Sequence, residues 1–161
     1  MKQTITNSEK ETYVLAKKYA KNLKGGAVLG LIGNLGAGKT VFIKGLAQGL
    51  GLKKNITSPT FVIMKVYPVK SRSARILPKA KLLNGAYSIK KGKIKNLVHI
   101  DAYRLKKGQD LIAIGAQEYF SRPETITVIE WADRVKKVLP KRTKYIKIKI
   151  LEDNKRKIAL K

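Results

Sequence analysis

Residues 33–40 read Gly-Asn-Leu-Gly-Ala-Gly-Lys-Thr, and this stretch decides the fold. It matches the phosphate-binding loop pattern G-x-x-x-x-G-K-[ST]. Glycines permit positive backbone φ angles, so successive N–H groups can converge on one anion. An apolar run (27–32) precedes the loop, and a segment with apolar residues at helical spacing (39–50) follows it. Strand, glycine-rich turn and helix in this order favour a phosphate site over a glycine turn without a ligand.

The side chains of the loop have predicted tasks. We expect Lys39 to reach the β- and γ-phosphates of a nucleotide, and the Thr40 hydroxyl to bind Mg²⁺. The helix that begins near Lys39 directs the positive end of its dipole at the same phosphates. The predicted nucleotide-binding residues of the loop are Gly33, Leu35, Gly36, Ala37, Gly38, Lys39, Thr40 and Val41.

Two acidic residues stand at the ends of apolar segments. Asp101 ends the run 97–101, and Glu130 ends the run 126–130. Ligands of parallel α/β sheets bind at the carboxyl ends of the strands, where such an acid can reach Mg²⁺ directly or through water. The chain has only 10 acidic residues, so two in this position favour a metal site over helix capping or a salt bridge.

The rest of the chain predicts further strands and helices around this unit. A capping box at Ser8 and Glu11 begins a helix that Gly25 and Gly26 end. The other expected elements are a strand at 60–67, a hairpin over 87–101 with a glycine turn at 91–93, one or two short helices at 111–120, a strand at 125–130, a helix at 131–139 and a terminal hairpin of 145–151 with 155–160. Alternating strands and helices predict an α/β fold, a three-layer sandwich of the P-loop NTPase type with a mostly parallel sheet and a C-terminal antiparallel hairpin.

Composition narrows the possible functions. There is no cysteine and one histidine, His99, which excludes thiolate chemistry and a metal site of several histidines. No apolar run approaches the roughly 18 residues of a membrane span, so we expect a cytoplasmic protein with no membrane partner. The net charge of +26 indicates either contact with a polyanion such as RNA or a lysine-rich surface.

Length and local charge complete the domain prediction. The 161 residues fit one domain, 1–161, with a basic insertion at about 67–96. That insertion holds nine Lys and Arg residues and no acid. It is either a surface that faces tRNA or a protein partner, or a solvated insertion.

Four stretches together resemble the TsaE (YjeE) family of ATPases along nearly the whole chain. They are the loop 33–40, the switch-like Ser58-Pro59-Thr60-Phe61, the H-x-D-x-Y-R stretch 99–104, and the pair Glu130-Trp131, with the element Gly115 to Phe120 between the last two. A phosphate loop alone is common to many NTPases, whereas this ordered combination in a short chain is specific. Asn34 and Val41 depart from the residues frequent in the family, and phosphate binding needs neither.

The resemblance implies a function and site residues. The family supports N6-threonylcarbamoyladenosine modification of tRNA by hydrolysing ATP with Mg²⁺ in association with the TsaB–TsaD complex, and tRNA is reached indirectly or through the basic insertion. Thr40 and Glu130 would hold the metal, Asp101 would lie beside the γ-phosphate or its attacking water, and Trp131 would lie beside the nucleotide. The implied catalytic residues are Lys39, Asp101 and Glu130. Ser58 and Thr60 would report the nucleotide state.

Several alternatives stay open from the residues themselves. His99 and Trp131 could serve packing, Tyr103 and Arg104 could brace the sheet, Glu118 could be a structural helix acid, and Arg104 or Arg134 could act as an arginine finger. A small P-loop kinase for a metabolite or nucleoside, or a nucleotide-dependent RNA-binding module, would also contain this loop. Acceptor-dependent formation of ADP separates the kinase from the ATPase.

Overall fold

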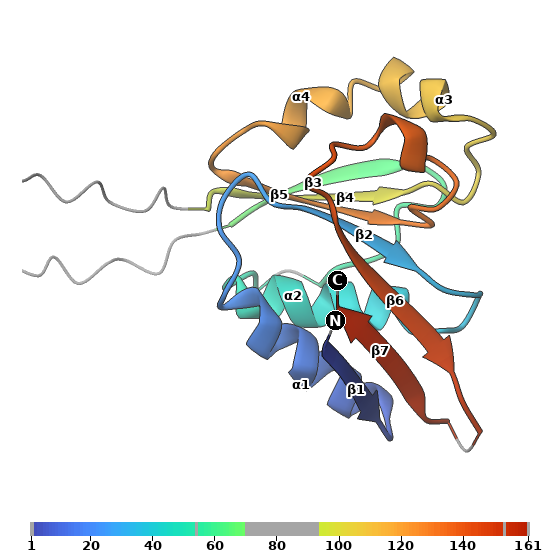
Figure 1. Cartoon of the computed structure of the whole chain (residues 1–161). Coiled ribbons are helices and arrows are strands. Elements are labelled where there is room, and N and C mark those ends of the chain that lie inside the picture. The colour runs from blue at the N-terminus through green and yellow to red at the C-terminus, as the bar shows by residue number, and fades with distance from the viewer. Residues whose placement is uncertain (1, 54, 70–93, 153, 161) are drawn as a thin grey trace, which may run out of the picture.

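The computed structural model describes residues 2–53, 55–69, 94–152 and 154–160 (Figure 1). Seven strands, four α-helices and one 3-10 helix lie in this part of the chain. Their order is β1 (Lys2–Thr6), α1 (Glu9–Ala20), β2 (Val28–Ile32), α2 (Lys39–Gly49), β3 (Met64–Pro68), β4 (Asn96–Asp101), α3 (Gly108–Ala113), α4 (Gln117–Phe120), β5 (Thr125–Glu130), η1 (Lys136–Val138), β6 (Lys144–Ile150) and β7 (Arg156–Leu160).

All seven strands form one sheet in the order β1-β7-β6-β2-β5-β4-β3. The four central strands, β6, β2, β5 and β4, are mutually parallel, and the pairings at both ends of the sheet are antiparallel. β6 and β7 form the antiparallel C-terminal hairpin that the alternating pattern predicted. The predicted α/β class and mostly parallel sheet are therefore confirmed.

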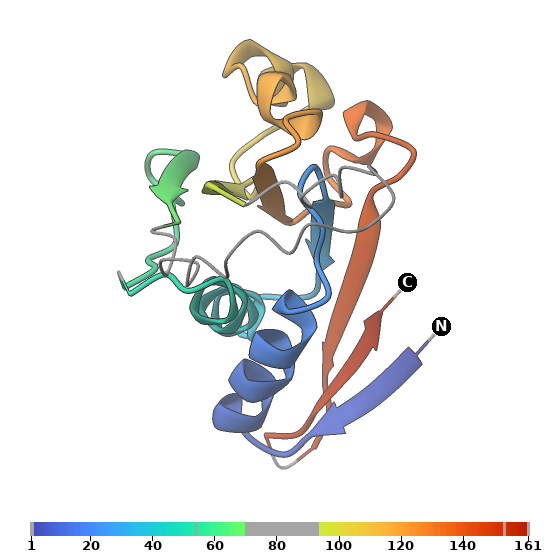
Figure 2. The same ribbon diagram turned by 90° about the vertical axis from the view of Figure 1, so that its left-hand side faces the viewer.

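Helices cover the sheet from two sides and make three layers. Figure 2 shows α1 and α2 together against one face, while α3 and α4 lie above the other side of the molecule. Each face has its own apolar core: Leu29, Phe42 and Ile126 belong to the core under α1 and α2, and Val98 and Ile129 to the core under α3 and α4. Within the described ranges, no helix is long and apolar enough to cross a bilayer.

Most predicted elements are present, but two predictions need correction here and one strand was not predicted. Residues 131–139 do not form an α-helix but turns and the short η1, because Trp131 takes a positive φ of 56° that a right-handed helix excludes. The strand predicted at 60–67 begins only at Met64, because residues 60–63 turn. β1 was not predicted, because Lys2–Thr6 has little apolar pattern and gains its strand partner only from β7.

The hairpin predicted over 87–101 needs correction, because its second strand is present as β4 but both edges of β4 pair with other strands, β3 and β5. β4 pairs antiparallel with β3, from Met64 opposite Ile100 to Pro68 opposite Asn96. Residues 70–93, with the predicted glycine turn at 91–93 and most of the basic insertion, lie outside the described residues.

Candidate nucleotide-binding site

The loop between β2 and α2 has the backbone of a phosphate cradle. Gly36 and Gly38 have φ angles of 74° and 97°, which only glycine adopts without strain. A Cβ atom on Gly33 would collide with the carbonyl oxygen of Ile148 in β6, so this position also requires glycine. No side chain caps the N-terminus of α2 at Gly38. The first-turn N–H groups of α2 therefore remain available to an anion.

Lys39 lies at the centre of the site. Its ammonium donates to the carbonyl oxygens of Gly33 and Asn34, both at 2.8 Å. The same Nζ lies 3.8 Å from the ring centroid of Trp131, a cation–π distance. Burial lowers the pKa of Lys39, and the nearby carboxylates of Glu130 and Asp101 oppose that shift. The carboxylates outnumber this ammonium, so the site suits a divalent cation together with a phosphate group.

Strand alternation brings the polar residues to the same face of the sheet. Leu97 of β4 and Ile126 of β5 belong to the core under α2. Because side chains of a strand alternate between faces, Asp101 and Glu130 point toward α2 as well. The two strands are parallel and in register, with Asp101 opposite Glu130. The carboxyl end of the sheet thus presents both acids to the start of α2.

Glu130 makes two contacts that suit a metal ligand. Its carboxylate oxygens accept from the Thr40 hydroxyl at 3.1 and 3.2 Å, and its Oε1 lies 2.8 Å from Nε2 of His99. Glu130 is 3% exposed and His99 is fully buried. Neighbouring oxygens on an octahedral Mg²⁺ are about 3.0 Å apart, given bonds of about 2.1 Å. The separation of Thr40 from Glu130 therefore fits two adjacent magnesium ligands.

The protein supplies few metal ligands beyond this pair. Among the described residues, no group of three or more Asp, Glu, His or Cys residues could hold a metal ion. Magnesium bound with nucleotides takes one or two protein ligands and completes its shell with phosphate oxygens and water. Thr40 and Glu130 fit that arrangement, which requires the nucleotide to be bound together with the metal.

Asp101 organises a second set of contacts. Its Oδ2 accepts from the hydroxyls of Ser58 at 2.9 Å and Thr60 at 2.6 Å, and its Oδ1 accepts from the backbone N–H of Tyr103 at 3.0 Å. The two hydroxyls also lie 2.7 Å from each other. Asp101 therefore ties the segment after α2 to the end of β4, and one side of its carboxylate remains free for a further donor.

A cleft of about 390 Å³ joins these groups, a size typical of ligand sites. All the predicted site residues line it except Gly33, which lies beneath the loop and touches β6. Its walls are formed by Glu9, Leu35, Gly36, Ala37, Gly38, Lys39, Thr40, Val41, Ser58, Thr60, Asp101, Tyr103, Glu130 and Trp131.

Trp131 owes its place in the cleft to a strained backbone. Its φ of 56° lies in the left-handed region that non-glycine residues seldom adopt, directly after β5. This turn brings the indole over Lys39 and 5.0 Å from the ring of Tyr103, measured between ring centroids. Strain of this kind concentrates at functional sites. Trp131 also packs against the core under α3 and α4, so it serves packing and lines the cleft as well.

Other singled-out residues lie away from the centre. Arg134 donates to the carbonyl of Leu105, and the guanidinium of Arg104 lies 4.8 Å from the Phe61 ring centroid. Neither arginine lines the cleft. Glu118 is an exposed helix acid that pairs with Arg122 at 3.5 Å.

Two charged residues at the edge of the cleft, Glu9 and Arg156, were not predicted from the sequence. Glu9 lines the cleft. Nη2 of Arg156, in β7, lies 3.4 Å from Oε1 of Glu9. The buried Arg156 side chain also packs under Gly38, whose absent Cβ would meet Nε at 3.1 Å. Glu9 lies in the first turn of α1, next to the capping residue Ser8, but the capping box of Ser8 and Glu11 does not indicate a place in the cleft. Arg156 had no sequence signal either, because only the sheet order places the last strand beneath the loop.

Comparison with known proteins supplies the family. The family model described as threonylcarbamoyl adenosine biosynthesis protein TsaE matches residues 6–77 and 81–158. The chain belongs to the TsaE family. It is similar to the TsaE protein of Treponema pallidum, at 35% identity over 97% of either chain, and to that of Bacillus subtilis, at 36% identity over 96% of this chain and 81% of the relative.

A solved structure agrees with this assignment. The crystal structure of Bacillus subtilis YdiB superimposes with a TM-score of 0.70 at 31% identity, and the match covers 99% of this chain and 83% of the other. The resemblance to TsaE that the four sequence stretches indicated is therefore confirmed. The TsaE family takes part in the biosynthesis of threonylcarbamoyladenosine in tRNA.

Proposed function

We propose that this chain is a Mg²⁺-dependent ATPase that acts in tRNA N6-threonylcarbamoyladenosine modification in association with the TsaB–TsaD complex. The observation that carries the proposal is one constellation in a TsaE-family chain. Lys39 and Thr40 of the phosphate loop meet Asp101 and Glu130 at the ends of two parallel strands. Loop, metal-binding hydroxyl and strand-end carboxylates are the parts that phosphoryl transfer to water requires.

The loop and Lys39 bind the phosphates. The N–H groups of Gly36 to Thr40 receive the β-phosphate, and the Lys39 ammonium turns from the carbonyls of Gly33 and Asn34 to the β- and γ-oxygens. Thr40 and Glu130 would hold Mg²⁺, which would supply charge neutralisation at the γ-phosphate. Nε2 of the buried His99 donates to Oε1 of Glu130, and this hydrogen bond would keep the carboxylate directed at the metal.

Asp101 has the position to orient water. The hydroxyls of Ser58 and Thr60 and the N–H of Tyr103 fix its carboxylate, so its unused lone pair has a defined direction. A water held there attacks the γ-phosphorus in line with the leaving β-phosphate oxygen. Trp131 and Tyr103 form an aromatic wall that shields the phosphates from bulk solvent.

The test is ATP hydrolysis measured with and without the TsaB–TsaD pair of the same organism. We expect Mg²⁺-dependent hydrolysis that the pair increases and that falls about 100-fold or more in Lys39→Ala and Glu130→Gln. The matched control, Glu118→Gln, removes an exposed acid outside the cleft and should keep the wild-type rate. A rate unchanged by the pair and by both site variants would contradict the proposal, and acceptor-dependent ADP formation would point to a kinase instead.

We further propose that tRNA is reached indirectly, through the protein partners, or through the basic insertion at about 67–96. A variant with its nine Lys and Arg residues changed to Ser decides between these routes. Loss of most tRNA affinity, with a smaller salt slope, would support the insertion. Unchanged affinity would exclude the insertion, and no tRNA affinity of the isolated wild type would leave the indirect route. Retained tRNA binding together with no hydrolysis in the wild type would favour an RNA-binding module.

A further inference from the structure

The turn after Ser58 presents two large apolar side chains to solvent. Phe61 is 84% exposed and Val62 is 59% exposed. Single exposed apolar residues are ordinary on protein surfaces, but a phenylalanine this exposed beside a second apolar side chain is a common mark of an interaction site. We define Phe61 and Val62 with the neighbouring Arg104 as the apolar tip.

The backbone holds the apolar tip in place. The N–H groups of Val62 and Ile63 both donate to the carbonyl of Pro59, and the N–H of Asp101 donates to the carbonyl of Ile63 at 2.9 Å. Ile63 has a φ of 63°, which is rare for a β-branched residue. This strained turn leaves the side chains of Phe61 and Val62 exposed to solvent, and β3 begins directly after it at Met64. This backbone fixes the exposure of the tip.

The apolar tip belongs to the rim of the nucleotide cleft. Thr60, the residue before Phe61, lines the cleft and donates to Asp101 at 2.6 Å. Leu35 of the phosphate loop lines the same cleft and is 80% exposed. Apolar side chains thus stand on segments that border the cleft, and one of these segments is hydrogen-bonded to a proposed catalytic acid.

Charge selects the kind of partner. The guanidinium of Arg104 lies over the Phe61 ring at 4.8 Å, and the chain carries a net charge of +26. Aromatic and arginine side chains in contact are typical of the residues that dominate protein interfaces. A complementary surface offers an apolar pocket for Phe61 with carboxylates beside it for Arg104. Two apolar side chains are too few for stable insertion into a lipid surface.

We propose that the apolar tip is the docking point for a protein partner with an acidic, apolar pocket, and that docking acts on catalysis through Thr60 and Ser58. This proposal rests on the proposed ATPase function. The turn that carries the tip already places both hydroxyls on Asp101, and a partner that binds Phe61 and Val62 stabilises this arrangement. Docking thus favours the state in which the carboxylate orients water, which links binding of the partner to hydrolysis.

The test compares three variants in binding to the purified TsaB–TsaD pair. Phe61→Ser combined with Val62→Ser should weaken binding of the pair at least tenfold, and Arg104→Ala should weaken it and reduce its salt dependence. Ile5→Ser is the matched control, because Ile5 is 57% exposed but lies on β1 at the edge of the sheet. Affinity for Mg²⁺-ATP of each isolated variant should stay within about twofold of the wild type, since no altered side chain lines the cleft.

The outcomes separate this proposal from the function beneath it. If the pair stimulates wild-type hydrolysis and the double variant binds the pair and is stimulated as the wild type is, the docking proposal is wrong and the ATPase function stands. If the pair neither binds to the wild type nor alters its hydrolysis, both are wrong. If the double variant also loses Mg²⁺-ATP affinity, the tip serves the cleft itself and the docking proposal is overturned.

Discussion

Asp101 and Glu130 share a face and a register but have different surroundings. Glu130 faces the Thr40 hydroxyl and His99, whereas Asp101 is surrounded by donors from Ser58, Thr60 and Tyr103. The first setting suits a metal ligand, and the second suits a residue that orients water and anchors the turn after Ser58. Removing either acid should therefore have a distinct effect.

Asp101→Asn tests this division of work. The amide keeps the shape but loses the charge and places an NH₂ group against the donors, so Ser58 and Thr60 lose a strong acceptor. We expect kcat for ATP hydrolysis to fall about 100-fold while the affinity for Mg²⁺-ATP changes little. Single-turnover kinetics with a parallel binding titration measures both. Asp110→Asn, which changes a half-buried acid of α3 outside the cleft, is the control. Equal losses of binding and rate would place Asp101 on the metal instead.

Lys39→Met tests the buried charge through pH. Burial lowers the pKa of Lys39 below its ordinary value of about 10.4, so above neutral pH the unfolded chain holds the more protons. The folding cost of the buried charge is present at neutral pH and fades as pH rises through the lowered pKa. We therefore expect the free energy of unfolding of the variant, minus that of the wild type, to decrease from pH 7 to 10. Urea unfolding at several pH values measures it. A difference that is constant or grows with pH would contradict the burial of this ammonium.

The sequence was informative about which residues form the site and poor on what surrounds them. The loop pattern and two strand-end acids could be read directly, because strand periodicity and sheet direction force them together. The sequence leaves the role of His99 open, because its contact with Glu130 depends on β4 and β5 lying in parallel register. The place of Arg156 beside the phosphate loop depends on where β7 lies in the sheet, and no local sequence pattern predicts that position.

At the scale of elements, α1 and α2 pack closely through small residues. A Cβ on Gly45 would lie 2.8 Å from the Cβ of Ala16 and would collide with the carbonyl oxygen of Tyr13. Glycine in a helix interior normally costs stability, so its presence here is explained by the close approach of the two helices. The packing fixes α2, and with it the start of the helix at the phosphate loop.

Gly45→Ala should therefore destabilise the protein despite the higher helix propensity of alanine. We expect a loss of about 1–3 kcal/mol in the free energy of unfolding, as for other overpacked cores. Lys44→Ala, at the exposed neighbouring position of α2, should change stability by less than about 0.5 kcal/mol. Urea denaturation followed by circular dichroism measures both. An equally stable Gly45→Ala variant would show that the helices can separate freely.

Residues 131–139, which were predicted as a helix and form turns and η1, show that apolar spacing alone does not establish a helix. Ala132, Val135 and Leu139 are apolar at spacings that a helix would give, and all three are buried in the core under α3 and α4. They reach that core through turns and η1 instead, because the chain leaves β5 with Trp131 at positive φ. Apolar spacing predicts burial well, and it predicts helix only where the backbone is free to begin one.

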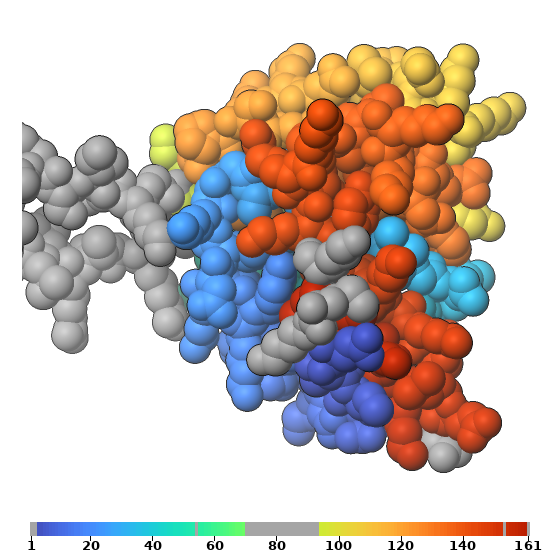
Figure 3. All heavy atoms as spheres, viewed as in Figure 1, coloured from blue at the N-terminus to red at the C-terminus, as the bar shows by residue number. Residues whose placement is uncertain are grey.

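At the scale of the whole molecule, the first and last strands pair with each other at one edge of the sheet. β1 pairs with β7 from Lys2 opposite Leu160 to Thr6 opposite Arg156, and the termini lie side by side in Figures 1 and 2. The C-terminal strands also form much of the face in Figure 3. The edge strand β1 thus supports the strand that carries Arg156 to the loop.

Deleting residues 1–6 should lower stability and leave nucleotide binding measurable. The truncation removes the β1 ladder and the buried hydrogen bond between Thr6 and Thr12, at 2.8 Å, which together should cost at least about 1 kcal/mol. Thermal unfolding with and without Mg²⁺-ATP measures both effects, since a ligand that binds the folded state raises Tm. An unchanged Tm without nucleotide would mean that β1 contributes nothing to the fold.

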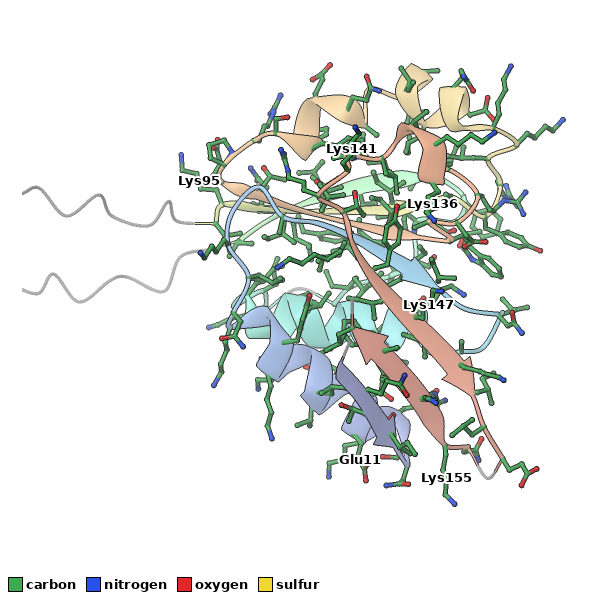
Figure 4. All side chains as sticks on the ribbon, in the orientation of Figure 1. Glu11, Lys95, Lys136, Lys141, Lys147 and Lys155 are labelled. Carbon is green, nitrogen blue, oxygen red and sulfur yellow. The ribbon has the colours of Figure 1, made fainter. Side chains whose placement is uncertain are left out.

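In the part of the chain that the structure describes, lysines lie on several separate elements. Figure 4 places Lys136, Lys141 and Lys147 along the segment from the end of β5 into β6, with Lys95 at the start of β4 and Lys155 beside β7. Composition could therefore predict an affinity for polyanions but not its location. The apolar tip could not be predicted from the sequence either, because the exposure of Phe61 and Val62 depends on the folded structure.

Trp131 permits the most direct test of the nucleotide site, because it is the only tryptophan of the chain. Its ring lies 3.8 Å from the Lys39 ammonium and lines the cleft. The measurement is a titration of tryptophan fluorescence with ATP in the presence and absence of Mg²⁺, for the wild type and for Lys39→Ala. We predict a saturable change in the wild type that is stronger with Mg²⁺ and lost in the variant. A flat titration, or one that Lys39→Ala reproduces, would contradict nucleotide binding at this cleft.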